Sequence, residues 1–386
     1  MKRSPLLSIF LIVLVDVLGL TIILPLLPFY AESLGATPIS VGMLVSAYAI
    51  CQLIAGPPLG ALSDRVGRRP VLLVSQIGTF IGFLILASAQ TLWVVFLARI
   101  IDGLTAGNLT VAQAYISDVA TPQNRARSFG LIGISFGLGF LVGPAIAGLL
   151  ARFGNQAPIL AAAGLSLTSI LATYFLLPGI PPHPAPEGER TTNWKLYVEA
   201  FRNTHLAPML WQFFAFAFAF STFFSGFALF AERRFTYNAR PFGTVEVGYV
   251  FAFSGLVGIL IQGGGITRLV KTFGERRLVE IGFATMAIGF GFLGFVYRIP
   301  YMLIAIAFLT FGSAVLRPCI TSLITTRAAR HRQGMVIGLM QSLMSIAQIV
   351  APFIAGALIQ HHQLSTWAWA GALVCGVGLS LIATTK

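Results

Sequence analysis

Long apolar stretches alternate with short polar connections along almost the whole chain. A helix needs about 20 apolar residues to cross the hydrocarbon core of a bilayer, and twelve stretches of that kind are present. They occupy residues 6–29, 41–62, 70–89, 92–115, 126–151, 157–178, 206–231, 246–270, 277–297, 300–325, 333–360 and 366–384. The pattern therefore predicts an all-α integral membrane protein with twelve transmembrane helices.

The composition supports this interpretation. Hydrophobic residues make up 56% of the 386 residues, charged residues only 10%, and the mean hydropathy is +0.86. Soluble domains carry about 25% charged residues, so a soluble enzyme, a DNA-binding protein and a disordered tail are excluded. The three cysteines lie in apolar runs, which predicts neither a disulfide framework nor a metal site.

One connection is longer than the others. Residues 179–205 contain four prolines followed by charged residues, a composition typical of a flexible linker. We therefore expect an N-terminal six-helix bundle over residues 1–178, a cytoplasmic linker over 179–205 and a C-terminal six-helix bundle over 206–386.

The basic residues predict the orientation. Most of the 25 lysines and arginines lie on one side of the membrane if the N-terminus is cytoplasmic, and positive charges in short loops favour that side. We therefore expect both termini in the cytoplasm and a multi-pass location in a bacterial-type inner membrane. The net charge of +13 is explained by these loops and not by nucleic-acid binding.

The two predicted bundles resemble each other in sequence at a shift of 207–208 residues. The aligned segments are Gly143–Gly148 with Ala351–Gly356, Gly130 with Gly338, and Gly67–Arg69 with Gly274–Arg276. A repeat of six helices in the same orientation relates two bundles by an axis along the membrane normal, with a substrate site near the midplane between them. That geometry suits alternating access.

Three segments resemble a known family. The segment GALSDRVGRR at Gly60–Arg69 is similar to the signature loop of the major facilitator superfamily, the standard example of such a repeat. The segment GLGFLVGPAIAG at Gly137–Gly148 resembles its antiporter motif, and DVLG at Asp16–Gly19 resembles the first span of its twelve-helix drug:proton antiporter branch. Nearly the whole chain is similar to tetracycline-efflux proteins, which implies the major facilitator fold and efflux.

The loop after the second span carries a cluster of charges and glycines. Its members are Gly60, Asp64, Arg65, Gly67, Arg68 and Arg69. They could be ordinary cytoplasmic charges, but their spacing and the family resemblance favour a conformational latch. In that latch Asp64 lies at a helix N-terminus and the arginines pair with neighbouring helix ends.

The fifth span carries small residues four positions apart. Gly139 and Gly143 are spaced to let helices approach closely, and Pro144 is expected to bend the helix. Together with Gly137 and Gly148 they form the motif that the resemblance links to antiport. Plain packing explains the same glycines, and we expect this span to close against a helix of the other half.

Ionisable residues at membrane depth are costly and are by default functional. Asp16 and Asp102 each lie about ten residues into a span, and Arg99 shares a helix face with Asp102. Arg99 and Asp102 are either a static ion pair or a proton site that loosens when Asp102 is protonated. Asp16 has no charged partner in its own span and is predicted to carry a proton or bind a cation.

Other buried polar residues are candidates for the substrate cavity. Arg317 lies nearer the cytoplasmic side of its span, and either lines the cavity or extends to water. The buried amides either bind substrate or bridge helices. They are Gln52, Asn108, Gln113, Gln341 and Gln348.

The chain departs from tetracycline exporters at two places. Those exporters carry acidic residues midway along spans three and nine, where this chain has Gly82 and Met286. The resemblance therefore implies antiport of a different or broader substrate.

We conclude that the sequence predicts a proton-coupled exporter of a small lipophilic or amphipathic compound. The alternatives are an importer or exchanger of a polar metabolite on the same fold, a membrane enzyme, and a receptor without turnover. An enzyme is disfavoured because no nucleophile–base pair is found. No phosphate-binding loop is present, so no cofactor is expected. The expected partners are a small-molecule substrate, protons and the lipid bilayer, and a monomer is expected.

Overall fold

The computed structural model describes residues 5–119, 125–179, 201, 206–327 and 333–382, which are mostly helical. Ten helical segments among them are long and apolar enough to cross a membrane, judged by length and composition. The apolar helix Leu364–Ser380 is shorter, and Glu275–Leu293 has four charged residues near its start. With these two, the described helices account for the twelve predicted spans.

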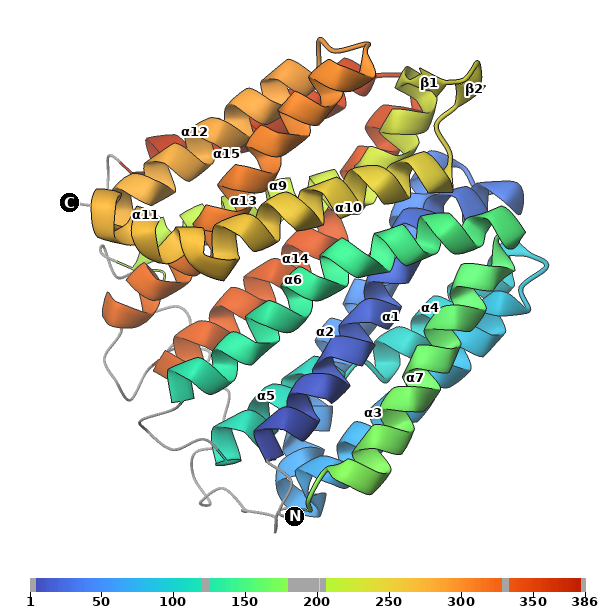
Figure 1. Ribbon diagram of the computed structural model, residues 1–386, viewed down its shortest axis with the longest axis vertical. Coiled ribbons are helices and arrows are strands. Elements are labelled where there is room, and N and C mark those ends of the chain that lie inside the picture. Colours follow the sequence, from blue (N-terminus) through green and yellow to red (C-terminus); the bar gives the residue numbers. More distant parts are fainter. Residues whose placement is uncertain (1–4, 120–124, 180–200, 202–205, 328–332, 383–386) are drawn as a thin grey trace. The chain divides into compact units, whose positions relative to one another are not determined.

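The first half of the chain is entirely helical in its described part (Figure 1). Its elements are α1 (Pro5–Ser33), α2 (Pro38–Val66), α3 (Arg68–Ala87), α4 (Leu92–Leu104), α5 (Asn108–Val119), α6 (Arg125–Leu150), the 3₁₀ turn η1 (Ala151–Phe153) and α7 (Gln156–Leu176).

The second half contains helices and one short hairpin. Its helices are α9 (Ala207–Arg234), α10 (Thr244–Leu260), the π turn η2 (Ile261–Gly265), α11 (Ile266–Phe273), α12 (Glu275–Leu293), α13 (Ile299–Arg327), α14 (Gln333–Gln360) and α15 (Leu364–Ser380). Strands β1 (Thr236–Tyr237) and β2 (Arg240–Pro241) pair antiparallel. The turn between them has positive φ at Asn238 and Ala239, as a tight hairpin requires.

Contacts divide the chain into two compact units. Unit 1 comprises residues 1–36, 47–190 and 243–255, and unit 2 comprises residues 37–46, 191–242 and 256–386. The start of α10 thus packs with unit 1, and the start of α2 packs with unit 2. The linker predicted over residues 179–205 lies almost entirely outside the described residues.

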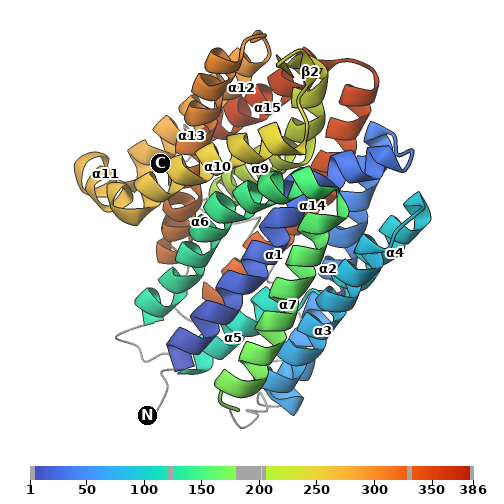
Figure 2. The ribbon, with the colours of Figure 1, turned by 45° about the vertical axis from the view of Figure 1, so that its right-hand side comes forward.

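Unit 1 is built around α1, which packs against α6 and α7, while α3 runs alongside α7 (Figure 2). A buried apolar cluster joins these helices to α5. It consists of Ile9, Ile12, Val13, Val17, Val71, Leu72, Val111, Ala112, Tyr115, Ile116, Ile132 and Leu177.

Unit 2 has an aromatic core. Phe230 of α9 stacks on Trp367 of α15 at 4.7 Å between ring centroids, and Phe290 of α12 meets the same indole at 6.2 Å. At the end of α9, Arg234 donates hydrogen bonds to the carbonyl oxygens of Gly294 and Val296 at the end of α12. One arginine therefore satisfies carbonyl groups that the helix end leaves free.

Two predicted spans are interrupted. The span predicted over residues 92–115 is divided into α4 and α5 by residues 105–107, and the span over 246–270 is divided at η2. Gly107 lies against Leu59 and Ser75, where a Cβ would come within 3.0 Å of both side chains. The second break contains Gly263, Gly264 and Gly265 in succession, and each glycine costs a helix about 1 kcal/mol relative to alanine.

Candidate functional site

Arg99 and Asp102 form a buried ion pair on α4. Arg99 Nη1 lies 2.8 Å from Asp102 Oδ2, and the two residues are only 6% and 5% exposed. The guanidinium also lies 4.2 Å from the centroid of the Tyr48 ring on α2, in a cation–π arrangement. Arg99 Nε is buried without a hydrogen-bond partner in the described part of the chain. The pair is therefore desolvated, with one donor left unused.

The break between α4 and α5 lies directly beside this pair. Asp102 is two residues from the end of α4, where a negative charge is unfavourable for the helix dipole, so Arg99 compensates it. The hydroxyl of Thr79 on α3 lies beside the Asp102 carboxylate. Asn108 begins α5 just after the break, and its buried Oδ1 has no partner among the described residues. The break thus gathers an acid, a base and an unused acceptor.

Asp16 lies among polar side chains of three helices. The side chains of Gln76 on α3 and Ser169 on α7 lie beside its carboxylate. Both are fully buried, and Gln76 Nε2 donates to Ser169 Oγ at 2.8 Å. Gln76 Oε1 has no hydrogen-bond partner among the described residues. Within the part of the chain that the structure describes, Asp16 therefore has polar neighbours but no ion-pair partner, and an unused acceptor lies nearby.

The residues predicted for the substrate cavity fall into both units. In unit 1, Gln52 donates to the Tyr48 hydroxyl at 3.3 Å, which links it to the Arg99 surroundings, and Gln113 is half-buried on α5. In unit 2, Arg317 and Gln341 are exposed and Gln348 is half-buried. Among the described residues of this group, Gln52 is linked to the ion-pair region through Tyr48, and Asn108 lies next to it along the chain, just after the break.

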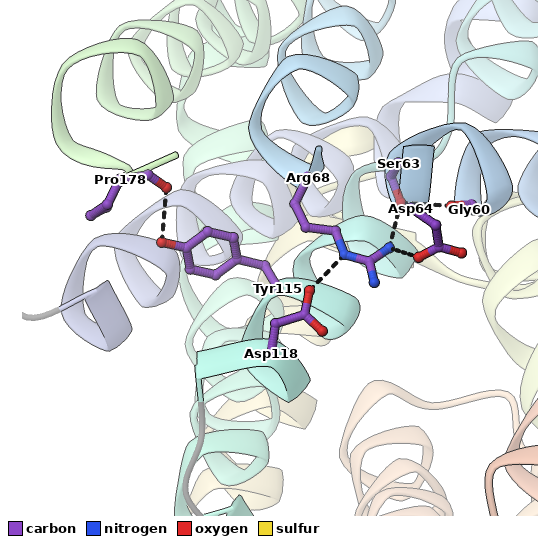
Figure 3. A network of polar contacts seen from close by, with 7 residues as sticks. All are labelled: Gly60, Ser63, Asp64, Arg68, Tyr115, Asp118 and Pro178. Atoms are coloured by element: carbon purple, nitrogen blue, oxygen red, sulfur yellow. Dashed lines mark hydrogen bonds and ion pairs between the residues drawn. The ribbon is translucent and has the colours of Figure 1, made fainter. Parts of the chain in front are cut away.

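The predicted latch is an ion-pair network at the junction of α2, α3 and α5 (Figure 3). Arg68 pairs with Asp64 of α2, and its Nε lies 2.8 Å from Asp118 Oδ2 at the end of α5. Arg68 Nη1 also donates to Ser63 Oγ at 2.7 Å, and Ser63 Oγ donates to the Gly60 carbonyl. Asp64 lies in the last turn of α2, not at a helix N-terminus as predicted.

The remaining latch residues play different parts. Gly67 has a φ of 103°, which favours glycine, in the sharp turn between α2 and α3. Arg69 donates to the carbonyl oxygen of Tyr174 near the end of α7, and its guanidinium lies 5.6 Å from the ring centroid of the same residue. Arg65 is exposed. The network thus joins α3 to α2, α5 and α7.

The antiporter motif is a packing surface used on two sides. Toward α1, a Cβ at Gly139 would lie 2.5 Å from Val17 Cγ1, Gly143 lies against Thr21, and Thr21 Oγ1 donates to the Gly139 carbonyl at 2.9 Å. Toward the start of α10, a Cβ at Gly148 would lie 3.1 Å from the Val245 carbonyl oxygen. Gly137, at the start of the motif, is half-buried.

Sequence reasoning missed several residues of these sites. Asp118 completes the latch, and its position just after the predicted fourth span, on the same side as Arg68, was the available signal. Three side chains contact the acids from other helices: Gln76, Thr79 and Ser169. Tyr48 contacts Arg99 in the same way, from α2. No pattern along the chain indicates such contacts.

The two departures from tetracycline exporters differ in their surroundings. A Cβ at Gly82 would lie 3.1 Å from Asp102 Cβ, so this position borders the ion pair directly. Met286 is buried at 2% exposure and packs against Gly312 of α13. Among the described residues, no group of three His, Cys, Asp or Glu side chains is arranged to hold a metal ion.

A helical fold with many membrane-spanning segments, buried charges and interrupted spans is typical of secondary transporters. The family model described as Major Facilitator Superfamily matches residues 9–271 and 265–385. The chain belongs to this superfamily.

Relatives and solved structures agree with this assignment. Tetracycline resistance protein, class B, of Escherichia coli is 30% identical, covering 92% of this chain and 88% of the relative. The class C protein of Escherichia coli is 31% identical, covering 96% and 93%. The crystal structure of the human organic anion transporter MFSD10 (TETRAN) has the same fold, with a TM-score of 0.74, 23% identity and 99% of both chains covered.

Proposed function

We propose that the chain is a proton-coupled exporter of small lipophilic or amphipathic compounds, a transporter and not an enzyme. The names of its relatives, which are tetracycline resistance and multidrug resistance proteins, support export of small drug-like compounds. We also propose that both termini are cytoplasmic, because the basic residues gather in the loops on that side. The bacterial relatives support a location in a bacterial-type inner membrane.

The observation that carries the proposal is the buried Arg99–Asp102 pair beside the α4–α5 break. An ion pair at membrane depth costs desolvation energy on both partners, and protonating Asp102 would remove half of the pair. The freed guanidinium and Asn108 Oδ1 would then have unused hydrogen-bonding capacity. Proton binding at Asp102 and release of a substrate contact at Arg99 would thus be linked.

Asp16 is proposed as a second proton-carrying group. Gln76 and Ser169 would hold its carboxylate in place. Gln76 Oε1 offers an acceptor to a protonated carboxyl, since it has no other partner in the described residues. Substrate contacts are proposed first at Gln52 and Asn108, which lie closest to the ion pair along the chain or through Tyr48. They are also proposed, with less support, at Gln113, Arg317, Gln341 and Gln348.

The test is proton movement in proteoliposomes that contain a pH-sensitive dye, with a panel of lipophilic cations, antibiotics and sugars. We expect at least one lipophilic compound to drive proton counterflow, and Asp16→Asn or Asp102→Asn to abolish it. Glu232→Gln is the matched control because it makes the same chemical change in a partly exposed pair with Arg233.

Two outcomes would contradict the proposal. Protons moving in the same direction as a metabolite would indicate the importer or exchanger instead. Normal counterflow in both aspartate variants would remove these acids from the coupling mechanism.

A further inference from the structure

The N-terminus of α12 borders an open depression of about 520 Å³ in unit 2. Its lining consists of Phe273, Gly274, Glu275, Arg276, Arg277, Glu280 and Leu323. Gly274 occupies the N-cap position, so no side chain caps the first amide groups of this 19-residue helix. Free amide groups and the helix dipole both favour an anion at such an end. Glu275, the acid in the first turn, instead accepts a hydrogen bond from Ser322 at 2.7 Å.

The charges beside this helix end also favour a bound anion. Arg276 and Arg277 lie in the first turn of α12, where the helix dipole disfavours a cation. Within the described residues, neither forms an ion pair with a carboxylate. Glu280 also lines the depression, so the lining carries acids as well as bases. An anion bound between the arginines would relieve their mutual repulsion.

A second, small cavity of about 20 Å³ adjoins the depression and shares Arg276 and Leu323 with it. Gln212 of α9 lines this cavity, is 3% exposed, and has an Nε2 without a hydrogen-bond partner in the described part of the chain. Arg327 of α13 lines it too and donates a long hydrogen bond of 3.8 Å to Met209 Sδ. A buried donor left unpaired is unfavourable, so a ligand that accepts from it is favoured. Donors from three helices therefore meet at one place.

The internal repeat allows the charges at the start of α12 to be compared with those at the corresponding start of α3 in unit 1. In unit 1, the carboxylates of Asp64 and Asp118 neutralise Arg68 at the start of α3. At the shift of 207 residues that relates Gly67 to Gly274, these two acids correspond to Lys271 and Thr325. At the same shift Arg68 corresponds to Glu275 and Arg69 to Arg276, so the start of α12 carries one acid followed by two arginines. Unit 1 thus supplies two carboxylates to its arginine at this helix end, and unit 2 has Lys271 and Thr325 at those two positions.

We propose that this corner of unit 2 binds the phosphodiester of a phospholipid headgroup. The first amide groups of α12, Arg276 and Arg327 would hold the phosphate oxygens. Phe273 and Leu323 supply an apolar wall at the end of membrane-spanning helices, which suits the acyl chains of a lipid and not a free phosphate ion. Basic pockets at the cytoplasmic ends of helices bind lipid headgroups in this way.

The test measures lipid binding directly. The purified full-length protein is titrated with dioleoyl-phosphatidylglycerol, and bound lipid is counted by native mass spectrometry. We expect Arg276→Gln/Arg327→Gln to weaken binding by about tenfold or more, the loss expected for two charge-assisted hydrogen bonds. Gln212→Leu should weaken it by a smaller factor. Arg240→Gln/Arg298→Gln, which removes two exposed arginines elsewhere in unit 2, should bind as the unchanged protein does.

Equal lipid binding by the Arg276/Arg327 and Arg240/Arg298 variants would overturn the proposal. Displacement of the lipid by millimolar inorganic phosphate would also overturn it, because the site would then recognise a soluble anion. Arg276→Gln alone changes one exposed side chain and gives a second reading if the double variant is unstable. The assay involves no transport, so its outcome is independent of the proposed exporter function.

Discussion

Gly248 of α10 lies against the carbonyl oxygen of Pro144 on α6, so closely that a Cβ at position 248 would be 2.6 Å from that oxygen. The repeat builds the same contact in unit 2, where Gly42 of α2 lies against the carbonyl oxygen of Pro352 on α14. Both glycines thus permit a backbone approach that a side chain would prevent.

Adding a methyl group at either contact should separate the helices. We expect Gly248→Ala and Gly42→Ala each to destabilise the protein by about 1–3 kcal/mol, the usual cost of overpacking, and to reduce transport severalfold. The measurements are thermal unfolding in detergent and substrate flux in vesicles. Gly258→Ala and Gly56→Ala are controls on the same two helices, because both positions face open space. If Gly248→Ala behaves like Gly258→Ala, the close contact has no role in stability or transport.

The Arg99–Asp102 pair predicts a specific pattern of rescue. Asp102→Asn should destabilise the protein by about 3–5 kcal/mol, because it leaves Arg99 as an uncompensated buried charge. Arg99→Gln/Asp102→Asn should recover most of that stability, since no charge remains buried. Transport-linked proton flux should stay abolished in the double variant. A double variant that both folds and exchanges protons normally would identify the pair as a static structural element.

The latch predicts a difference between neighbouring charges. Asp118→Asn should lower thermal stability by about 1 kcal/mol or less, because the Asp118 side chain is 27% exposed and exposed pairs contribute little. If the pair with Arg68 holds one conformer, as the latch hypothesis requires, its effect on transport should be much larger. Arg65→Gln, an exposed neighbour, serves as the control. Parallel losses of flux in both variants would show that only the loop's net charge matters.

Replacing a glycine of the η2 run should raise thermal stability and lower the rate of transport. Gly264→Ala meets no atom within 4 Å and should favour a continuous helix by about 1 kcal/mol. If the break between α10 and α11 serves conformational change, thermal stability should rise while turnover falls. The comparison is the unfolding midpoint against the rate of flux, measured on the same preparation. Unchanged turnover would mean that the break only accommodates packing.

The membrane-spanning helices were predictable because lipid imposes one simple requirement, a long apolar run. The two breaks were not, since hydropathy averages over a window. Thr105 and Gly107 lower the mean hydropathy of a window only slightly, so the window does not reveal the break. The close contacts of Gly107 with Leu59 and Ser75 on other helices are not visible in the sequence.

The candidate site was predictable only where its members share a helix. Arg99 and Asp102 are three residues apart, so helical spacing placed them together. Asp118 reaches Arg68 from 50 residues away, and Gln76 meets Ser169 across 93 residues. Such contacts depend on which helices pack together, and the repeat alone did not predict those pairs.

Gln76 and Thr79 stand about one turn apart on the same side of α3, the former beside Asp16 and the latter beside Asp102. The two acids belong to different helices, but each has a hydrogen-bonding neighbour on α3. A small rotation of α3 about its axis would withdraw a hydrogen-bonding group from both carboxylates at the same moment. Protonation of one acid would then be felt by the other without any direct contact between them.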